Sequence, residues 1–391
     1  MNMLLKGLAW RSGEKIMKGD IRIQNGLISE IGYALEPSKR ERNISFDNHF
    51  VYPGLINSHD HLEMNLYPRL GNPPYHNYIE WGNDTYKPKE SPIKEIEKVS
   101  FKDRLLWGGV KNLISGVTTV VHHNPWNRFL STKEFPVRVL KKYSWAHSLG
   151  FGKDISKSFP NDSKVPFIIH AAEGVDEIAY NEVNKLSNLG LLKKNTVLIH
   201  AVALTIQNIT MLQASKSSIV WCPSSNYFLF NKTAPIRQLK KLINIALGSD
   251  STLTGLSTFL DEIRFASQTK LASTTEIYNQ VTLNPSLIFG LPKPSIDTNK
   301  QADLFILPIA HEDYAENLIH SYSSDMELVL LDGDPKFCSE SIAKELGLKR
   351  NFANVNGSTK WFCLDVHQLK KRIQKVTGNV VEASPLWKLI D

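Results

Sequence analysis

The chain is poor in cysteine, and its few cysteines form no recognisable pattern. Cys222, Cys338 and Cys363 are odd in number and contain no Cys-x-x-Cys pair. They therefore indicate neither a disulfide framework nor a zinc finger. A reducing, cytoplasmic setting fits this cysteine usage best.

Long apolar runs are missing as well. No stretch of about 18 consecutive apolar residues occurs, which argues against a transmembrane helix. The first residues, MNMLLKGLAWRSGEK, have only a very short apolar patch and no small-residue cleavage site, so we expect no signal peptide. The sequence thus predicts no association with a membrane.

Neither sign of charge is concentrated in one part of the chain. The protein has 46 Lys and Arg against 39 Asp and Glu, a net charge of +7 and a pI near 9.0. The basic residues are spread out, and a denser cluster, HQLKKRIQK, has the pattern of a solvated helix face. A scattered surplus of this kind usually keeps a surface soluble, so we predict no nucleic-acid partner.

What the sequence does contain is a three-part organisation. Residues 1–50 alternate apolar and polar residues around a turn signal at Asn25–Gly26, which is typical of short strands. Residues 51–296 contain seven clear apolar runs, mostly followed by longer helical stretches, and an eighth is expected in FPVRVL or in a compressed form. Such alternation predicts an α/β fold with buried parallel strands. Strand-like runs return after residue 300, before a helical tail at residues 361–391.

Residues suited to metal chemistry end four of these apolar runs. In a parallel α/β barrel, the catalytic groups come from the carboxyl ends of several different strands. The sequence therefore predicts that the following side chains meet at one end of a barrel: His59, His61, His170, Glu173, His200 and Asp250.

The spacing of the first two histidines has a physical reason. Residues two apart on a strand point to the same face, so the rings of His59 and His61 can reach one ion. Imidazole nitrogens with one carboxylate oxygen suit zinc or ferrous iron, which lowers the pKa of a bound water toward neutrality. In such a site Glu173 can protonate a leaving nitrogen, and His200 can orient the nucleophile or stabilise a developing oxyanion.

Each of these features also has an ordinary explanation when it is taken alone. A His-x-His pair is common on polar surfaces, and His170 would fit a hydrogen-bonded core histidine. Glu173 would fit a solvated acid in a first helical turn, and Gly-Ser-Asp is a common turn or helix-cap signal. Their occurrence at successive strand ends favours a metal site over these separate explanations.

Five ordered motifs resemble those of the amidohydrolase superfamily: PGLINSHDHL, IIHAAE, VLIHAVAL, WCPSSNYFL and ALGSDS. The resemblance covers most of residues 1–310 and is strongest to the branch that contains cytosine deaminase, guanine deaminase and the triazine hydrolases. It implies a distorted (β/α)8 TIM-like barrel with a small β-sandwich built from both chain ends. Residues 51–296 would form the barrel, residues 1–50 plus 297–360 the composite β-sandwich, and residues 361–391 a C-terminal helical tail.

The resemblance also implies a role for each residue at the strand ends. No lysine ends a strand before His170, so one divalent metal ion, Zn or Fe, is expected rather than a two-metal centre with a carboxylated lysine. Asp250 would also accept a proton from the metal-bound water. The family's metal ligands match His59, His61, His170 and Asp250, its proton shuttle matches Glu173, and its strand-6 histidine matches His200.

Two departures from the family pattern leave the substrate open. Residues 125–167 form a shorter stretch than typical deaminases of this branch use for two strands and a substrate loop. The region after His61 lacks an obvious Gln or Arg signature of a purine or pyrimidine site.

Further side chains near the predicted metal are candidates for substrate contact. VVHHNPW ends an early strand with His122, His123 and Trp126, which we predict as substrate contacts, with loop polarity and packing of the indole as the alternative. Aromatic residues after the first barrel strand suit stacking on a flat heterocycle, anchoring of the loop, or a subunit interface: Tyr67, Tyr75, Tyr78, Trp81 and Tyr86.

These observations predict a metal-dependent hydrolase of a non-peptide C–N bond. Deamination of a small cyclic or aromatic amine by a metal-bound hydroxide is the favoured reaction. Hydrolysis of a ring amide, or of a C–Cl or other leaving group, by the same site is the alternative. A non-catalytic metal-binding scaffold is the alternative of another class, although no predicted ligand is missing. The expected partner is a small molecule, and a homo-oligomer stays open.

Overall fold

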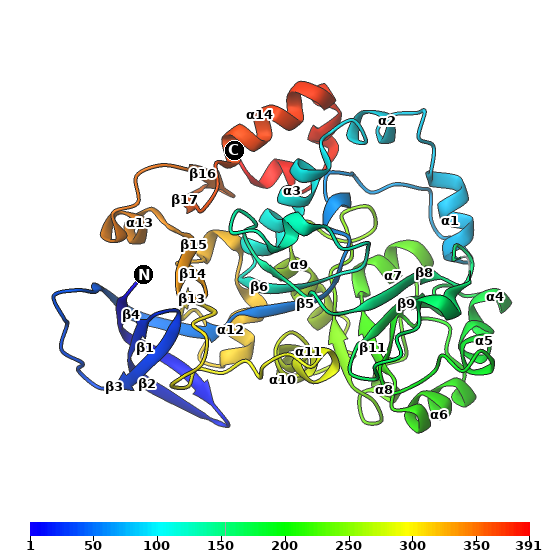
Figure 1. Ribbon diagram of the computed structural model, residues 1–391, viewed down its shortest axis with the longest axis horizontal. Helices are drawn as coiled ribbons and strands as arrows, with labels where there is room; N and C mark the ends of the chain where they lie inside the picture. The colour runs from blue at the N-terminus through cyan, green and yellow to red at the C-terminus, as the bar shows by residue number, and fades with distance from the viewer. Residues whose placement is uncertain (153) are drawn as a thin grey trace.

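The computed structural model describes residues 1–152 and 154–391 and arranges the chain around three sheets. Figure 1 shows the strands of both chain ends, in blue and orange, on one side of the molecule and a part rich in parallel strands and helices, mainly green, on the other. The parallel strands position the candidate site.

Two sheets of parallel strands form the centre of the α/β part. Their orders are β5-β6-β7 and β12-β11-β10-β9-β8. Most of these strands are buried along their whole length, as expected when helices and neighbouring strands cover both faces. The strands are β5 (Leu55–Asp60), β6 (Val117–His122), β7 (Arg138–Val139), β8 (Ser144–Ser148), β9 (Phe167–Ala171), β10 (Thr196–His200), β11 (Ser218–Trp221) and β12 (Ile245–Leu247).

The eighth strand lies in FPVRVL and is only two residues long. It is β7, which pairs with β6 in parallel. The chain then reaches β8 through residues 140–143, with no intervening helix. This direct connection explains why residues 125–167 are so short. The two sheets meet between β5 and β12, where the Asp250 N–H donates to the main-chain oxygen of His59 at 3.1 Å.

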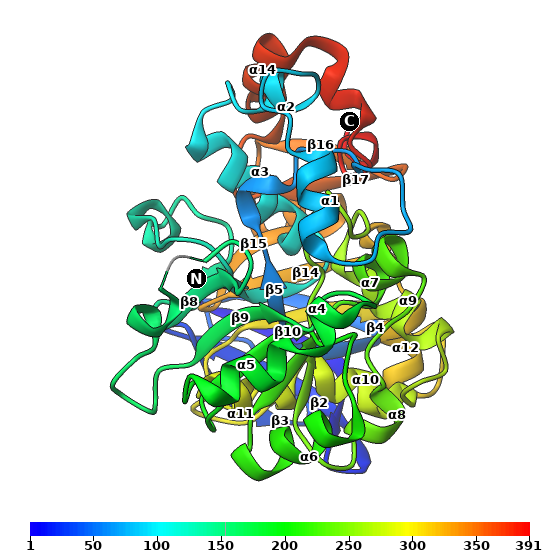
Figure 2. The same ribbon diagram turned by 90° about the vertical axis from the view of Figure 1, so that its right-hand side faces the viewer.

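Helices follow several of the parallel strands, and Figure 2 shows α5, α6 and α8 in the lower half of the molecule, with α6 at its lower edge. The long α3 precedes β6, and its first turn is capped by the Ser100 side chain. The α-helices are α1 (Tyr78–Thr85), α2 (Ile93–Ile96), α3 (Phe101–Leu113), α4 (Glu177–Tyr180), α5 (Glu182–Asn188), α6 (Ile206–Ser215), α7 (Pro223–Phe230), α8 (Ile236–Leu239), α9 (Phe259–Gln268), α10 (Thr274–Gln280), α11 (Leu283–Phe289), α12 (Tyr314–His320), α13 (Glu340–Leu346) and α14 (Val366–Thr377). The 3-10 helices are η1 (Leu62–Met64), η2 (Arg128–Ser131), η3 (Ile155–Ser158), η4 (Ser323–Asp325), η5 (Gly378–Ala383) and η6 (Trp387–Leu389).

Both ends of the chain contribute to one nine-stranded sheet of order β16-β17-β15-β14-β13-β4-β1-β2-β3. The two ends join where β4 and β13 pair antiparallel, with Val51 opposite Ile306. The strands are β1 (Met3–Ser12), β2 (Lys15–Gln24), β3 (Leu27–Gly32), β4 (Arg42–Pro53), β13 (Leu304–Pro308), β14 (Leu328–Leu331), β15 (Asp334–Ser339), β16 (Phe352–Val355) and β17 (Ser358–Phe362).

This sheet has an apolar core of its own. Leu5 from β1, Ile21 from β2 and Ile306 from β13 are fully or almost fully buried in one cluster, separate from the main core under the parallel strands. Alternation of apolar and polar residues along each strand puts these side chains on one face. The N-terminal strands therefore depend on the C-terminal strands for burial.

The C-terminal tail packs against α3 and α2, and Figure 1 shows α14 in red beside them. Arg372 on α14 donates to the Asp103 carboxylate of α3 at 2.7 Å, and the rings of Trp107 and Trp387 lie 5.1 Å apart. Among the described helices, none has the length and apolarity that a membrane crossing requires.

Candidate metal centre and pocket

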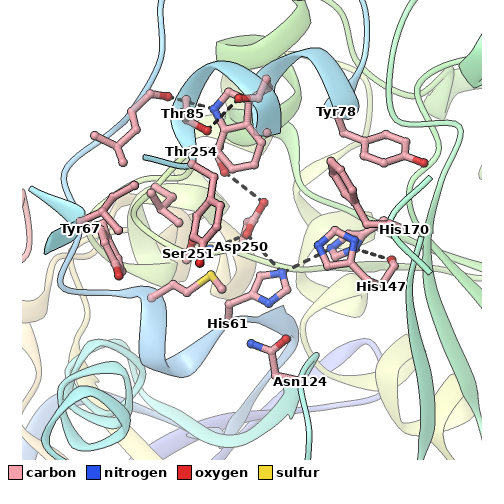
Figure 3. Close-up of a pocket in the computed structure, with 18 of the residues that line it drawn as sticks. His61, Tyr67, Tyr78, Thr85, Asn124, His147, His170, Asp250, Ser251 and Thr254 are labelled. Carbon is pink, nitrogen blue, oxygen red and sulfur yellow. Dashed lines mark hydrogen bonds and ion pairs between the residues drawn. The ribbon is translucent and has the colours of Figure 1, made fainter. Parts of the chain in front are cut away.

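Six polar side chains converge at the carboxyl ends of the parallel strands, and all six are buried. When a strand ends inside the protein, its polar side chains need hydrogen-bond partners or a bound ion there, because water does not reach them. Figure 3 shows His61, His170 and Asp250 directed toward one another. The six come from the ends of β5, β9 and β10 and from the loop after β12: His59, His61, His170, Glu173, His200 and Asp250.

Three histidine nitrogens face one point. His170 Nε2 lies 3.3 Å from His61 Nε2 and 3.4 Å from His59 Nε2. His170 Nδ1 lies 2.7 Å from the main-chain oxygen of His147, so Nδ1 carries the hydrogen and Nε2 keeps a free lone pair. Burial, and then the neighbouring histidines, lowers the pKa of His59 and His170. The lowered pKa values leave His59 and His170 with neutral nitrogens, which are suitable donors for a metal.

Asp250 places a carboxylate beside these nitrogens. Its Oδ1 lies 3.9 Å from His59 Nε2 and 4.0 Å from His61 Nε2. Its Oδ2 accepts hydrogen bonds from Ser225 Oγ at 2.9 Å and Thr254 Oγ1 at 3.0 Å. The backbone of Asp250 is left-handed, with φ of 54°, which is uncommon for a residue with a side chain and frequent at functional sites.

His200 lies between the two carboxyl groups of the site. Its Nδ1 lies 2.8 Å from Asn226 Oδ1, and the Asn226 amide donates to Thr233 Oγ1 at 3.1 Å, so His200 Nδ1 is the donor. Its Nε2 is 3.5 Å from Glu173 Oε1 and 3.8 Å from Asp250 Oδ2. His200 also has a left-handed backbone, with φ of 72°, which sends the chain away from the strand end.

The two carboxyl groups have opposite protonation preferences. Burial raises the pKa of Asp250, but His61, His200 and its hydrogen bonds outweigh burial, so its pKa is lowered overall. Burial raises the pKa of Glu173 well above its usual range, and Asp250 and Glu182 raise it further. The pKa values of these two neighbouring carboxyl groups are thus moved in opposite directions, and such a pair suits acid–base chemistry.

The donor set fits a divalent transition metal. One ring nitrogen each from His59, His61, His123 and His170 lies within 4.8 Å of the others, and the same holds for donor atoms of His59, His200 and Asp250. Imidazole nitrogens with one carboxylate oxygen are ligands that zinc and iron accept. The site therefore has the chemistry of a His/Asp metal-binding cluster.

The three residues predicted as substrate contacts all lie off the pocket wall. His123 belongs to the histidine cluster, with its ring 4.2 Å from that of His170 and its Nε2 3.0 Å from the Ala146 main-chain oxygen. His122 is fully buried and faces Glu63, whose Oε2 is 3.8 Å from His122 Nε2. Trp126 is exposed on the loop.

A pocket of about 410 Å³ opens from the histidine cluster. Its lining includes Asn124, from the predicted VVHHNPW segment, and also His147, Ser251 and Thr254, which were not singled out in the sequence. His147 ends β8 in the run YSWAHS, so the rule of polar strand ends would have found it. Burial lowers the pKa of His147 to about 4, so its ring enters the pocket in the neutral form.

Most of the predicted loop aromatics line this pocket. Tyr67, Tyr78, Trp81 and Tyr86 lie on its wall, and Figure 3 shows Tyr67 on the opposite side of the pocket from His170. Tyr75 lies outside the wall and donates to Asp84 Oδ2 at 2.5 Å. Much of the wall is therefore aromatic and apolar.

Comparison with known proteins decides the family. The model of the amidohydrolase family matches residues 140–335, half of the chain. The chain belongs to the amidohydrolase family. This amidohydrolase is therefore an enzyme of the predicted class, a metal-dependent C–N hydrolase, and the resemblance of its ordered motifs is confirmed.

Named relatives and solved structures resemble this amidohydrolase over most of its length. It is 27% identical to a 5-methylthioadenosine/S-adenosylhomocysteine deaminase of Pyrococcus furiosus, covering 75% of this chain and 82% of the relative. It is 23% identical to a 5'-deoxyadenosine deaminase of Methanosphaera stadtmanae, covering 82% and 90%.

Solved structures share the fold of this amidohydrolase. A zinc-bound adenosine deaminase from Xanthomonas campestris has a TM-score of 0.74 at 17% identity, covering 97% of this chain and 98% of that one. An atrazine chlorohydrolase from Arthrobacter aurescens, complexed with zinc, has a TM-score of 0.72 at 16% identity, covering 96% and 100%.

Proposed function

We propose that this amidohydrolase deaminates an amino-substituted heterocycle, with a purine nucleoside as the first substrate class to test. The observation that carries the proposal is the buried Glu173, whose Oε1 lies 3.5 Å from His200 Nε2 beside the donor cluster and whose pKa is raised well above its usual range by burial. The named relatives, which are deaminases of adenine nucleosides, support the reaction and the substrate class.

We assign one divalent metal ion to His59, His61, His170 and Asp250. The lowered pKa values of His59 and His170 keep lone pairs available, and the ionised Asp250 supplies the negative charge. When bound, such a metal supplies a hydroxide nucleophile near neutral pH. Zinc is the first candidate because the neighbouring structures hold zinc, and iron is the second.

The protein groups around this site divide the proton transfers among them. Hydrolytic deamination adds water to the ring carbon that bears the amino group and releases ammonia. In our assignment, ionised Asp250 accepts a proton from the attacking water, and Glu173 donates its proton to the substrate nitrogen. His200, fixed by Asn226, has Nε2 between these carboxyl groups and orients the reacting oxygen.

We also propose a finer architecture around this site. The two parallel sheets would form one distorted (β/α)8 barrel over residues 51–296, supported by the contact between Asp250 and His59 at the junction of β12 and β5. Residues 1–50 plus 297–360 would form a composite β-sandwich domain, supported by their common sheet and common apolar core. Residues 361–391 would be the helical tail on α3.

Ammonia release over a substrate panel tests the reaction. The panel contains 5'-deoxyadenosine, 5-methylthioadenosine, guanine, cytosine and a chlorotriazine, with zinc-loaded protein and with the Glu173→Gln variant as the control. We expect ammonia from at least one adenine nucleoside, and release about 10²–10⁴-fold slower from the variant. Chloride release from the chlorotriazine, without ammonia from any compound, would instead indicate that the enzyme hydrolyses a C–Cl bond.

A further inference from the structure

The pocket wall contains one strong cation, Arg104, beside Tyr67, and Figure 3 shows Tyr67 on the side opposite His170. The wall there is formed by the loop after β5, by α2 and by the first turns of α3, and it includes Ile93, Glu97 and Arg104. Among the described lining residues, Arg104 is the one lysine or arginine. It lies in the second turn of α3 and is partly buried.

Arg104 has no counter-ion inside the protein. No carboxylate of residues 1–152 or 154–391 lies within 4.0 Å of its guanidinium, and its Nε is buried without a hydrogen-bond partner. Arg264 also has an unpartnered Nε, but its other nitrogens donate to Asp261 and to the Ser321 main chain. The hydroxyl of Tyr67 is a neutral hydrogen-bonding neighbour of Arg104. A partly desolvated guanidinium without a counter-ion is costly, because it loses hydration without gaining an opposite charge.

The neighbours of Arg104 leave its charge uncompensated. The Phe101 ring centroid is 5.4 Å away, which gives at most a weak cation–π contact. Burial raises the pKa of the nearby Tyr67 to about 12, so that hydroxyl is neutral and cannot cancel the charge. Glu97 is on the same wall but is exposed, so water solvates its carboxylate.

We infer that Arg104 binds an anionic group, a carboxylate or a phosphate, carried by the substrate at the end remote from the reacting amine. The inference rests on the proposed function for the position of the amine. A volume of about 410 Å³ accommodates more than a single ring. The planar guanidinium offers paired donors that match the oxygens of either anion, and Tyr67 can add a neutral hydroxyl.

A first experiment requires no knowledge of the reaction. Phenylglyoxal modifies accessible arginines, and peptide mass spectrometry gives the modification rate of Arg104 and of the exposed Arg350 in the same zinc-loaded sample. Benzoate and benzamide share a flat ring and differ in charge. We expect benzoate to slow modification of Arg104 several-fold, benzamide to have no effect, and neither to protect Arg350. Equal rates of Arg104 modification with and without benzoate would overturn the inference.

A second experiment separates the two anions and uses matched variants. Ammonia release is compared for 5'-deoxyadenosine, adenosine 5'-carboxylate and adenosine 5'-monophosphate. In Arg104→Gln, we expect kcat/KM for the preferred anionic compound to fall about 10- to 100-fold, as for loss of a charged hydrogen bond, with the neutral compound within about 3-fold. Arg128→Gln, which removes an exposed positive charge, controls for long-range electrostatics.

The two proposals fail in different ways. If no panel compound releases ammonia, the deaminase proposal fails, and the benzoate protection of Arg104 still decides the anion site. If 5'-deoxyadenosine is deaminated and the anionic compounds have no advantage in the wild type, or keep their advantage in Arg104→Gln, the anion site is wrong and the deaminase proposal stands.

Discussion

The ammonium of Lys111 lies 3.4 Å from Asp60 Oδ2, and both side chains are completely buried. Asp60 is the last residue of β5 and lies between His59 on that strand and His61 directly after it. Lys111 Nζ also donates to the main-chain oxygen of Asp250 at 2.6 Å and to Ser249 Oγ at 3.0 Å. One cation on α3 therefore holds the ends of β5 and β12 together where those strands meet.

Lys111→Met tests whether this ion pair positions the metal ligands. Removing one member of a buried pair leaves the other charge uncompensated, so we expect a loss of about 3–5 kcal/mol in unfolding free energy. We also expect weaker zinc binding in a chelator competition, because the anchor of the Asp250 main chain is lost. Lys241→Met, at an exposed lysine, should change neither quantity.

The double variant Lys111→Met/Asp60→Asn distinguishes positioning from stability alone. Both charges are then absent, so the unfolding free energy should recover most of the loss. The hydrogen bond to Asp250 is still missing, so zinc affinity should stay low. Recovery of zinc affinity together with stability would mean that Lys111 acts only on the fold.

The metal assignment predicts one equivalent of zinc or iron per chain. His59 is fully buried, and its Nε2 lies 3.4 Å from His170 Nε2 and 3.9 Å from Asp250 Oδ1. His59→Ala should therefore lose metal and activity together. Elemental analysis after dialysis measures the stoichiometry, and His367→Ala at an exposed histidine is the control. Two equivalents that survive dialysis would contradict the single-ion assignment.

Glu173→Gln should separate proton transfer from metal binding. The amide keeps the shape of the side chain but cannot supply the proton that the raised pKa of Glu173 retains, so we expect kcat to fall about 10²–10⁴-fold. Metal content and Tm should stay close to those of the wild type. Glu177→Gln, in the exposed first turn of α4, is the control, and turnover within a few-fold of wild type would reassign the proton to His200 or Asp250.

The site was accessible from the sequence because its residues obey a local rule. His59, His61, His170 and His200 each end an apolar run, and strand ends meet at one edge of parallel strands. The parallel strands could be predicted from the sequence as well, because the length of the apolar runs and their spacing along the chain indicate buried strands. The two-residue β7 is too short to give such a signal and was left open.

Tertiary contacts decided what the sequence could not. Lys111 looks like an ordinary helix lysine until the structure buries it against Asp60. Adjacent residues at a strand end face opposite sides, so a shift of one position decided that His123, and not His122, joins the histidine cluster. The guanidinium of Arg104 likewise became notable only because no carboxylate of the described residues pairs with it.

Glu182 should make stability depend on pH. Burial raises its pKa from 4.5 to about 7, although hydrogen bonds from the Tyr78 hydroxyl and the Ala172 N–H act to lower the pKa. Between pH 4.5 and 7 the folded state then binds more protons than the unfolded state, so this group's contribution to stability falls as pH rises. The full change is about 3 kcal/mol.

The measurement is the unfolding free energy of wild type and of Glu182→Gln from pH 5 to 8. The variant cannot ionise, so its stability relative to wild type should improve by a few kcal/mol as pH rises, whatever constant offset the lost hydrogen bond causes. An exposed matched change, Glu345→Gln, should give a difference that hardly varies with pH. A flat difference for Glu182→Gln would contradict the raised pKa.

The sheet shared by the chain ends predicts that residues 1–50 cannot be removed without damage. Their deletion takes away β1 to β3 and most of β4, the partner of β13. Leu304 and Ile306, now almost fully buried, would lose their cover, and β13 would present an open edge to other chains. We expect the 51–391 fragment to aggregate in size-exclusion chromatography, and co-expression of residues 1–50 as a separate chain to restore soluble protein by supplying the missing strands. A soluble, active 51–296 fragment would show that the barrel residues fold without either end, and the composite domain would then be an accessory rather than a support.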